Sequence, residues 1–267
     1  MSSQNQLMKN NYHTHTYLCN HATGTVDDYV KKAIELGFDT IGISDHGPMD
    51  EFTDRSLRMA PEEYPLYIKQ CEKARDKYKD KIIVLQAVEI EYLPNHDEYY
   101  KRLLLNLDYL ALGQHYIIDE KAQNNLRSVY RLSTIEHLKS YADIVIEGMK
   151  SGFFAFLCHP DVMLINVHEF TNEIEQISDR IIEASIRYNV PLEINTNGIR
   201  KKPIEINNEK RYRYPRKEFW QRVKKKNAQV IVSSDAHQPN HLFDKDVERA
   251  YAFADELDIT VEEELDL

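Results

Sequence analysis

The sequence lacks several features that would mark whole classes of protein. It contains no apolar run long enough to span a lipid bilayer, which argues against an integral membrane protein. Residues 1–11 are polar and lack the apolar segment of a secretory signal peptide, so we expect a cytoplasmic protein. Cysteine is scarce, and Cys19, Cys71 and Cys158 form an odd, widely spaced set that is typical of reduced thiols.

Positive charge is also in short supply. The chain has 34 Lys and Arg residues against 44 Asp and Glu residues, which gives a net charge of −10 at pH 7. This balance argues against a protein that binds nucleic acid by general electrostatic attraction. Linkers, low-complexity tracts and internal repeats are absent too, so we expect a single domain over residues 1–267. With 42% hydrophobic residues, that domain can bury a core.

Short apolar runs alternate with amphipathic stretches along the whole chain. We expect strands near 9–12, 38–44, 82–88, 107–112, 153–158, 191–195 and 228–233. We expect helices over about 25–37, 61–80, 96–105, 134–150, 171–189, 216–227 and 240–257. The first of these helices has a capping signal at Thr25 and Asp28 and a stop signal at Gly37. Alternation of this kind predicts βαβ units, and therefore an α/β protein with a parallel sheet.

Polar side chains follow every predicted strand, at the point where the strand ends. They are His13 and His15, Asp45 and His46, Glu89 and Glu91, Gln114 and His115, His159 and Asp161, Glu193 and Asn195, and Asp235 and His237. In a (β/α) barrel the carboxyl ends of the strands meet on one face, where the active site lies. We therefore expect these side chains to surround a single site.

Most of these side chains are metal ligands by type. Imidazole nitrogen and carboxylate oxygen suit zinc, manganese and iron, and side chains two residues apart, such as His13 and His15, point to the same side of a strand. The candidate ligands are His13, His15, His21, His46, Glu89, His115, His159, Asp235 and His237. Nine ligands are more than one ion needs, so the sequence predicts two or three ions with Glu89 as a bridge, although Glu91 on the same strand face could be the ligand instead.

A cluster of divalent ions suits one reaction above others. Bound ions activate water and can hold both the attacking and the leaving oxygen of a displacement. Hydrolysis of phosphate monoesters needs this help most. The sequence therefore predicts a metal-dependent hydrolase whose partner is a small-molecule phosphate monoester.

The ligand motifs resemble, in order and spacing from residue 13 to residue 237, those of the polymerase-and-histidinol-phosphatase (PHP) superfamily. Within it the chain is similar to the monofunctional histidinol-phosphate phosphatases of histidine biosynthesis. The resemblance implies a distorted, TIM-like (β/α)₇ barrel and three divalent ions, which would be Mn²⁺, Fe²⁺ or Zn²⁺. It assigns the first ion to His13, His15, Glu89 and Asp235, the second to Glu89, His115 and His159, and the third to His21, His46 and His237.

Several other residues are candidates for contacts with the substrate. Arg200 follows the sixth strand and is predicted to bind the phosphate, while the neighbouring basic residues, Lys201 among them, read mainly as a solvated charge run. Asp45 is the candidate catalytic acid, or an orienting partner of a ligating histidine. The substrate amine has four candidate partners, namely Asp50, Glu51, Asp54 and Asp161.

Three alternatives stay open. The chain could be another phosphoesterase of the superfamily, such as a nucleotide phosphatase or an exonuclease. It could be an amidohydrolase, although His21 and His46 would then have no role and Glu89 would stand where a carbamylated lysine is common. It could also be a metal-binding scaffold without turnover, although every ligand position is filled.

Overall fold

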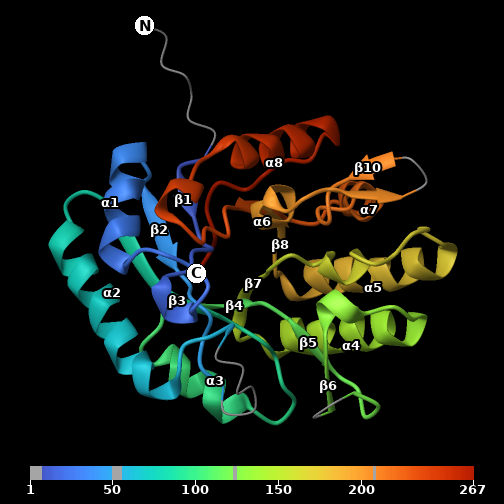
Figure 1. Cartoon of the computed structure of the whole chain (residues 1–267), viewed down its shortest axis with the longest axis horizontal. Coiled ribbons are helices and arrows are strands. Elements are labelled where there is room, and N and C mark those ends of the chain that lie inside the picture. Colours follow the sequence, from blue (N-terminus) through green and yellow to red (C-terminus); the bar gives the residue numbers. More distant parts are fainter. Residues whose placement is uncertain (1–7, 50–55, 123–124, 207–208) are drawn as a thin grey trace, which may run out of the picture.

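The computed structural model describes residues 8–49, 56–122, 125–206 and 209–267, and its centre is a seven-stranded parallel sheet (Figure 1). The strands are β1 (Asn10–Asn11), β2 (Thr40–Ile43), β3 (Ile83–Ile90), β4 (Tyr109–Leu112), β7 (Phe154–Leu157), β8 (Leu192–Asn195) and β11 (Val230–Ser233). They lie in chain order across the sheet, and each pairs in parallel with its neighbour. All seven predicted strands are present.

The sheet curls into a nearly closed barrel. Beyond the ends of β1 and β11, Thr14 and Ala236 form a parallel bridge, in which the amide of His15 donates to the Ala236 carbonyl over 2.9 Å. At the opposite end of the same seam, the amide of Glu262 donates to the Val230 carbonyl over 2.7 Å, so the C-terminal segment lies against β11. The predicted α/β fold, a distorted (β/α)₇ barrel, is confirmed.

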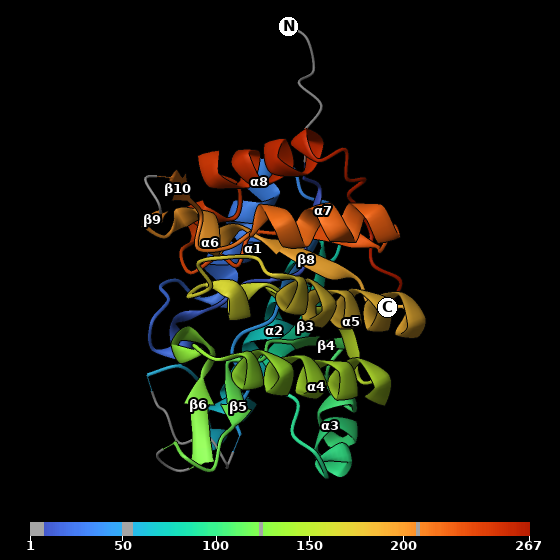
Figure 2. The same ribbon diagram turned by 90° about the vertical axis from the view of Figure 1, so that its right-hand side faces the viewer.

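Helices cover the outside of the barrel, and Figure 2 shows α8, α7, α5 and α4 following one another around it. The helices are α1 (Val26–Leu36), α2 (Tyr64–Tyr78), α3 (Asp97–Leu104), α4 (Ile135–Ser151), α5 (Asn172–Tyr188), α7 (Lys217–Lys226) and α8 (Lys245–Glu256). The capping box of Thr25 and Asp28 starts α1, and Gly37, with a φ of 75°, ends it as predicted. In the part of the chain that the structure describes, no helix combines the length and apolar character needed to cross a lipid bilayer.

The structure also contains several short elements that the sequence pattern does not predict. They are the hairpin of β5 (Tyr116–Ile118) and β6 (Leu126–Ser128), the short helix α6 (Thr196–Arg200), and the hairpin of β9 (Ile204–Ile206) and β10 (Glu209–Arg211). Short 3₁₀ turns occupy Tyr17–Cys19, Pro61–Glu63, Val129–Arg131, Val162–Leu164 and Pro239–His241. Elements of three to five residues are too short to show a hydrophobic period.

The barrel interior is filled by a small apolar cluster that supports the strand ends. It consists of Tyr12, Ala87, Tyr109, Ala111, Phe156, Cys158 and Ile231, all buried. Because side chains alternate along a strand, Ala87 and Glu89 share the inner face of β3, with the apolar residue one layer below the carboxylate. Phe156 lies under His13 in the same way, at 6.3 Å between ring centroids. An apolar floor thus lies below the polar layer at the barrel mouth.

Candidate metal centre

A cavity of about 360 Å³ opens at the carboxyl ends of the strands. Eight of the nine candidate ligands line it: His15, His21, His46, Glu89, His115, His159, Asp235 and His237. The ninth, His13, lies deeper and is fully buried, with its Nε2 atom 3.0 Å from the Nε2 atom of His15. Residues spread over more than two hundred positions of the chain therefore meet at one place.

The deepest group is formed by four ligand atoms, from Glu89 in β3 and from the segments that follow β1 and β11. The His15 Nε2 atom lies 3.1 Å from Asp235 Oδ1 and 3.5 Å from Glu89 Oε2, and the His13 Nε2 atom lies 3.4 Å from the same Glu89 oxygen. Tetrahedral ligands with metal bonds of about 2.1 Å are roughly 3.4 Å apart. The spacing of the four atoms thus suits one ion.

Glu89 also faces a second group with its other oxygen. Its Oε1 atom lies 2.9 Å from His159 Nε2 and 3.5 Å from His115 Nε2. One carboxylate therefore presents separate oxygens to two sets of imidazoles. Burial alone would raise the pKa of Glu89, but His46, His115 and His13 hold it well below its ordinary value.

The third group lies toward the outside of the cavity. The Nε2 atoms of His21 and His237 are 3.0 Å apart, and the ring of His46 has its centroid 5.2 Å from that of His21. His46 also approaches Glu89 Oε2 through Nδ1, at 3.1 Å. The three histidines thus converge next to the Glu89 carboxylate.

The hydrogen bonds of His21 and His237 indicate which ring nitrogens carry a proton, and therefore whether the site suits a cation. The Nδ1 atoms of His21 and His237 lie 2.9 and 3.1 Å from the carbonyl oxygens of Cys19 and Asp235, which can only accept. Both Nδ1 atoms therefore carry the proton in the neutral rings, which leaves two Nε2 lone pairs facing each other. Such an arrangement is repulsive unless a positive charge lies beside it. Asp235 Oδ1, which is buried and lies 3.1 Å from His15 Nε2, completes a donor set that fits divalent cations.

Buried carboxylates behind the ligands fix the orientation of the rings. Glu193 lies 2.7 Å from His13 Nδ1, and Glu91 lies 3.2 Å from His115 Nδ1. Glu91 is itself bound by the buried Arg58 over 2.7 Å. Burial raises the pKa of Glu91, but Arg58 and His115 outweigh it and hold the value at about 2. Partners of this kind set the tautomer and raise the basicity of a ligating histidine. Glu91 does not line the cavity, which favours Glu89 over Glu91 as the metal ligand.

The backbone adapts locally to aim these side chains. His159 and Asp235 have φ values of 32° and 44°, in the left-handed region that costs free energy for residues other than glycine. Gly113 makes room for the bridging carboxylate, since a Cβ atom there would lie 2.1 Å from Glu89 Oε1. Strain of this type is common at functional sites.

Asp45 and Arg200 lie outside the cavity lining. Asp45 is fully buried, accepts hydrogen bonds from the amides of Thr16 and His46, and lies 3.5 Å from His15 Nδ1. Arg200 forms a two-pronged ion pair with Asp244 at 2.9 and 3.1 Å and also donates to the carbonyls of Ser234 and His241. Their proposed roles in proton transfer and phosphate binding stay predictions, and the geometry favours structural roles instead.

Of the four residues predicted to contact the substrate amine, the structure describes one, Asp161, and it does not line the cavity. Asp161 is buried, and its Oδ2 atom accepts hydrogen bonds from the amide of Arg216 and from the indole of Trp220. Asp50, Glu51 and Asp54 lie outside the described residues. The histidines that do not belong to the predicted ligand set do not line the cavity; they are His96, His137, His168 and His241.

Five further residues line the cavity: Leu57, Tyr130, Asn197, Lys201 and Tyr214. The sequence pattern placed Lys201 in a solvated charge run, but the structure places it in the cavity wall. Among the described lining residues, Lys201 is the one lysine or arginine. Its Nζ atom lies 3.0 Å from the Tyr214 hydroxyl and 3.4 Å from that of Tyr130, and 4.8 Å from the Tyr130 ring centroid. A cation held by two tyrosines thus faces the histidine cluster.

Comparisons with known proteins agree with this geometry. A protein of Deinococcus radiodurans named probable histidinol-phosphatase is 25% identical over 242 residues, which is 86% of each chain. The crystal structure of a candidate histidinol phosphatase from Listeria monocytogenes has a TM-score of 0.73 and 22% identity, over 91% of this chain and 99% of that one. Histidinol phosphate phosphatase from Lactococcus lactis, solved with zinc, L-histidinol and phosphate, has a TM-score of 0.70 and 15% identity over 97% and 99%.

The family follows from the sequence pattern. The pattern of the PHP domain matches residues 11–197, which include six of the seven barrel strands in part or whole and most of the candidate ligands. The chain belongs to the PHP domain family.

Proposed function

We propose that the chain is a metal-dependent phosphomonoesterase that hydrolyses L-histidinol phosphate to L-histidinol and phosphate, as a step of histidine biosynthesis. The observation that carries the proposal is the bridging position of Glu89, whose two oxygens face separate sets of imidazoles at 2.9 to 3.5 Å. The names of the similar proteins from Deinococcus radiodurans and Lactococcus lactis support the choice of substrate.

The proposed centre holds three divalent ions, each Mn²⁺, Fe²⁺ or Zn²⁺. His13, His15, Glu89 and Asp235 hold the first, Glu89, His115 and His159 the second, and His21, His46 and His237 the third. When bound, such ions supply an activated water and neutralise charge on the phosphoryl group. The protein's own part is to keep the Nε2 lone pairs of His13 and His115 free. Glu193 and Glu91 do this by accepting hydrogen bonds from the Nδ1–H groups of these rings, which keeps the protons on Nδ1.

Lys201 is proposed to bind the phosphoryl group in place of Arg200. Its ammonium group lines the cavity and has no carboxylate within ion-pair distance among the described residues, so its charge is available to an anion. Tyr214 supports it. Burial raises the pKa of Tyr214 well above its ordinary value, so the hydroxyl keeps its proton and can donate to a substrate oxygen while accepting from Lys201.

The apolar part of the cavity suits the imidazole ring of the substrate. Leu57 and the Tyr130 ring line the same cavity as the histidine cluster. A planar ring that packs between an aliphatic and an aromatic side chain buries apolar surface on both faces.

A single domain over residues 1–267 and a cytoplasmic location remain predictions from the sequence.

Two measurements test the proposal together. Elemental analysis of the purified protein should find close to three divalent ions per chain, and phosphate release should be fastest from L-histidinol phosphate within a panel that includes nucleotides and other monoesters. The Asp235→Asn variant should lose bound metal as well as phosphatase activity. Faster turnover of nucleotides would favour a nucleotide phosphatase, amide cleavage without phosphate release an amidohydrolase, and bound metal without any turnover a scaffold.

A further inference from the structure

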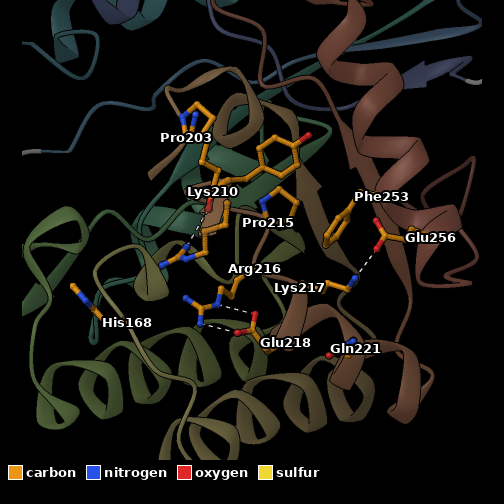
Figure 3. A pocket seen from close by; sticks show the side chains of 12 residues that line it. His168, Pro203, Lys210, Pro215, Arg216, Lys217, Glu218, Gln221, Phe253 and Glu256 are labelled. Atoms are coloured by element: carbon orange, nitrogen blue, oxygen red, sulfur yellow. Dashed lines mark hydrogen bonds and ion pairs between the residues drawn. The ribbon is translucent and has the colours of Figure 1, made fainter. Parts of the chain in front are cut away.

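A second and larger cavity, of about 690 Å³, lies outside the metal centre (Figure 3). It is formed by the β9–β10 hairpin, the start of α7 and the end of α8, and it shares no lining residue with the metal cavity. Its volume is within the range of pockets that hold small ligands. The proposed phosphatase function gives it no role.

The cavity is basic in a chain that is acidic overall. Four of its lining residues are cationic, namely Lys210, Arg211, Arg216 and Lys217, and two are acidic, Glu218 and Glu256. Both acids are already paired: Arg216 binds Glu218 through two nitrogens at 2.7 and 2.8 Å, and Lys217 binds Glu256 at 2.5 Å (Figure 3). Two positive charges are left over.

One of these is the half-buried guanidinium of Arg211. It donates only to backbone carbonyls, the shortest of them that of Val167 at 2.9 Å, and its Nε atom is buried without a partner among the described residues. Burial and the neighbouring Arg216 lower the pKa of Arg211 to about 10. A cation whose charge is disfavoured by its surroundings, and which contacts no carboxylate, is stabilised by an incoming anion.

The other is Lys210, which is exposed at the edge of the cavity. Among the side chains that the structure describes, Arg216 and Lys217 pair with carboxylates, whereas Lys210 and Arg211 do not. The remaining wall includes Pro203, Pro215 and Phe253, which offer flat, apolar surface next to the charges. A ligand that matches both features needs an anionic group and a flat apolar portion.

We propose that this cavity is a second binding site, for a small organic anion that places a phosphate or phosphonate group against Lys210 and Arg211. Its flat portion packs on Pro203, Pro215 and Phe253. Arg216 and Lys217 stay with their carboxylate partners and keep the surrounding potential positive. The site is separate from the metal centre, so it does not depend on which phosphate ester the metal centre hydrolyses.

Calorimetric titration with phenylphosphonate tests the proposal, because this ligand has a flat ring and a P–C bond that phosphatases do not hydrolyse. The metal-loaded wild-type protein should show two binding events, one of them at the metal centre. Lys210→Glu should weaken the other event about tenfold, as expected for the loss of a charge-assisted contact. Lys225→Glu is the matched control, since Lys225 is exposed on α7 outside the cavity and should leave both events unchanged.

A single binding event in the wild-type protein, or equal weakening by Lys210→Glu and Lys225→Glu, would overturn the proposal. Arg211→Gln should abolish the second event, and its thermal midpoint will show whether the variant is folded. If it does not fold, Lys210→Glu still decides. Methylphosphonate, which keeps the anion and lacks the ring, should bind this cavity more weakly than phenylphosphonate, and equal affinity would refute the role of the apolar wall.

Discussion

Gly113 follows β4 and leaves the space that the bridging carboxylate of Glu89 occupies. In a Gly113→Ala variant the new Cβ atom would lie 2.1 Å from Glu89 Oε1 and 2.4 Å from Glu89 Cδ. Non-bonded carbon and oxygen atoms need more than about 3 Å, so the carboxylate has to move by roughly 1 Å. Gly113 does not have a positive φ, so this contact is the main cost of the substitution.

A shift of about 1 Å at a reacting centre can lower the rate about 100-fold. We therefore expect kcat for histidinol phosphate to fall by about two orders of magnitude and the metal content to fall by at least one ion per chain. Elemental analysis and phosphate release measure the two effects on the same sample. Gly152→Ala is the control, because its Cβ atom meets nothing within 4 Å. Since Gly152 has a φ of 76°, that variant should lose about 1 kcal/mol of stability but keep its ions and its activity. Full metal content and full kcat in Gly113→Ala would refute the bridging position of Glu89.

Four other substitutions separate the roles of single contacts. Lys201→Met should raise KM for histidinol phosphate about tenfold with unchanged metal content, and an unchanged KM would remove Lys201 from the phosphate site. Arg200→Lys should lower the free energy of unfolding by about 1–3 kcal/mol in denaturant titrations, because the paired contact with Asp244 is lost; a large rise in KM instead would return phosphate binding to Arg200. Glu193→Gln should weaken metal binding about 10- to 100-fold, measured by competition with a chelator, and unaltered affinity would contradict its role behind His13. Asp161→Asn tests a pH effect. Burial raises the pKa of Asp161 from 3.8 to about 6 in the folded state, so the ionised carboxylate costs about 3 kcal/mol of stability above pH 6, and this cost disappears as the pH falls toward 4. The variant should therefore gain stability relative to the wild type as pH rises from 4 to 7, and a constant difference in unfolding free energy would disprove the shift.

The barrel could be predicted because its signals are local. Except for β1, each barrel strand is a short, mainly apolar run followed by polar residues. In β3 the apolar positions reach the core, and Glu89 lies near the end of the strand, at the mouth. The His13 and His15 pair follows from the alternation of side chains along a strand. Signals of this kind depend only on neighbours in the sequence.

The substrate side could not be predicted in the same way. Lys201 and Arg200 are adjacent, but Arg200 ends α6 and turns toward Asp244, whereas Lys201 follows the helix and lines the cavity. No hydrophobic period fixes the direction of a side chain at the end of a five-residue helix. The buried pair of Arg58 and Glu91 joins residues 33 positions apart, and a contact of that kind has no local pattern.

The seam between the first and last strands has a consequence for the protein without metal. At the mouth, β1 and β11 are joined through the Thr14 and Ala236 bridge, which lies between His13 and His15 on one side and Asp235 and His237 on the other. An ion bound by residues from both segments would join them where β1 and β11 share no ladder of backbone hydrogen bonds. Chelation should then increase hydrogen exchange first at the amides of His15 and Ala236, while those of β3 and β4 stay protected. The metal ions would then also hold the segment that follows β1 against the segment that follows β11.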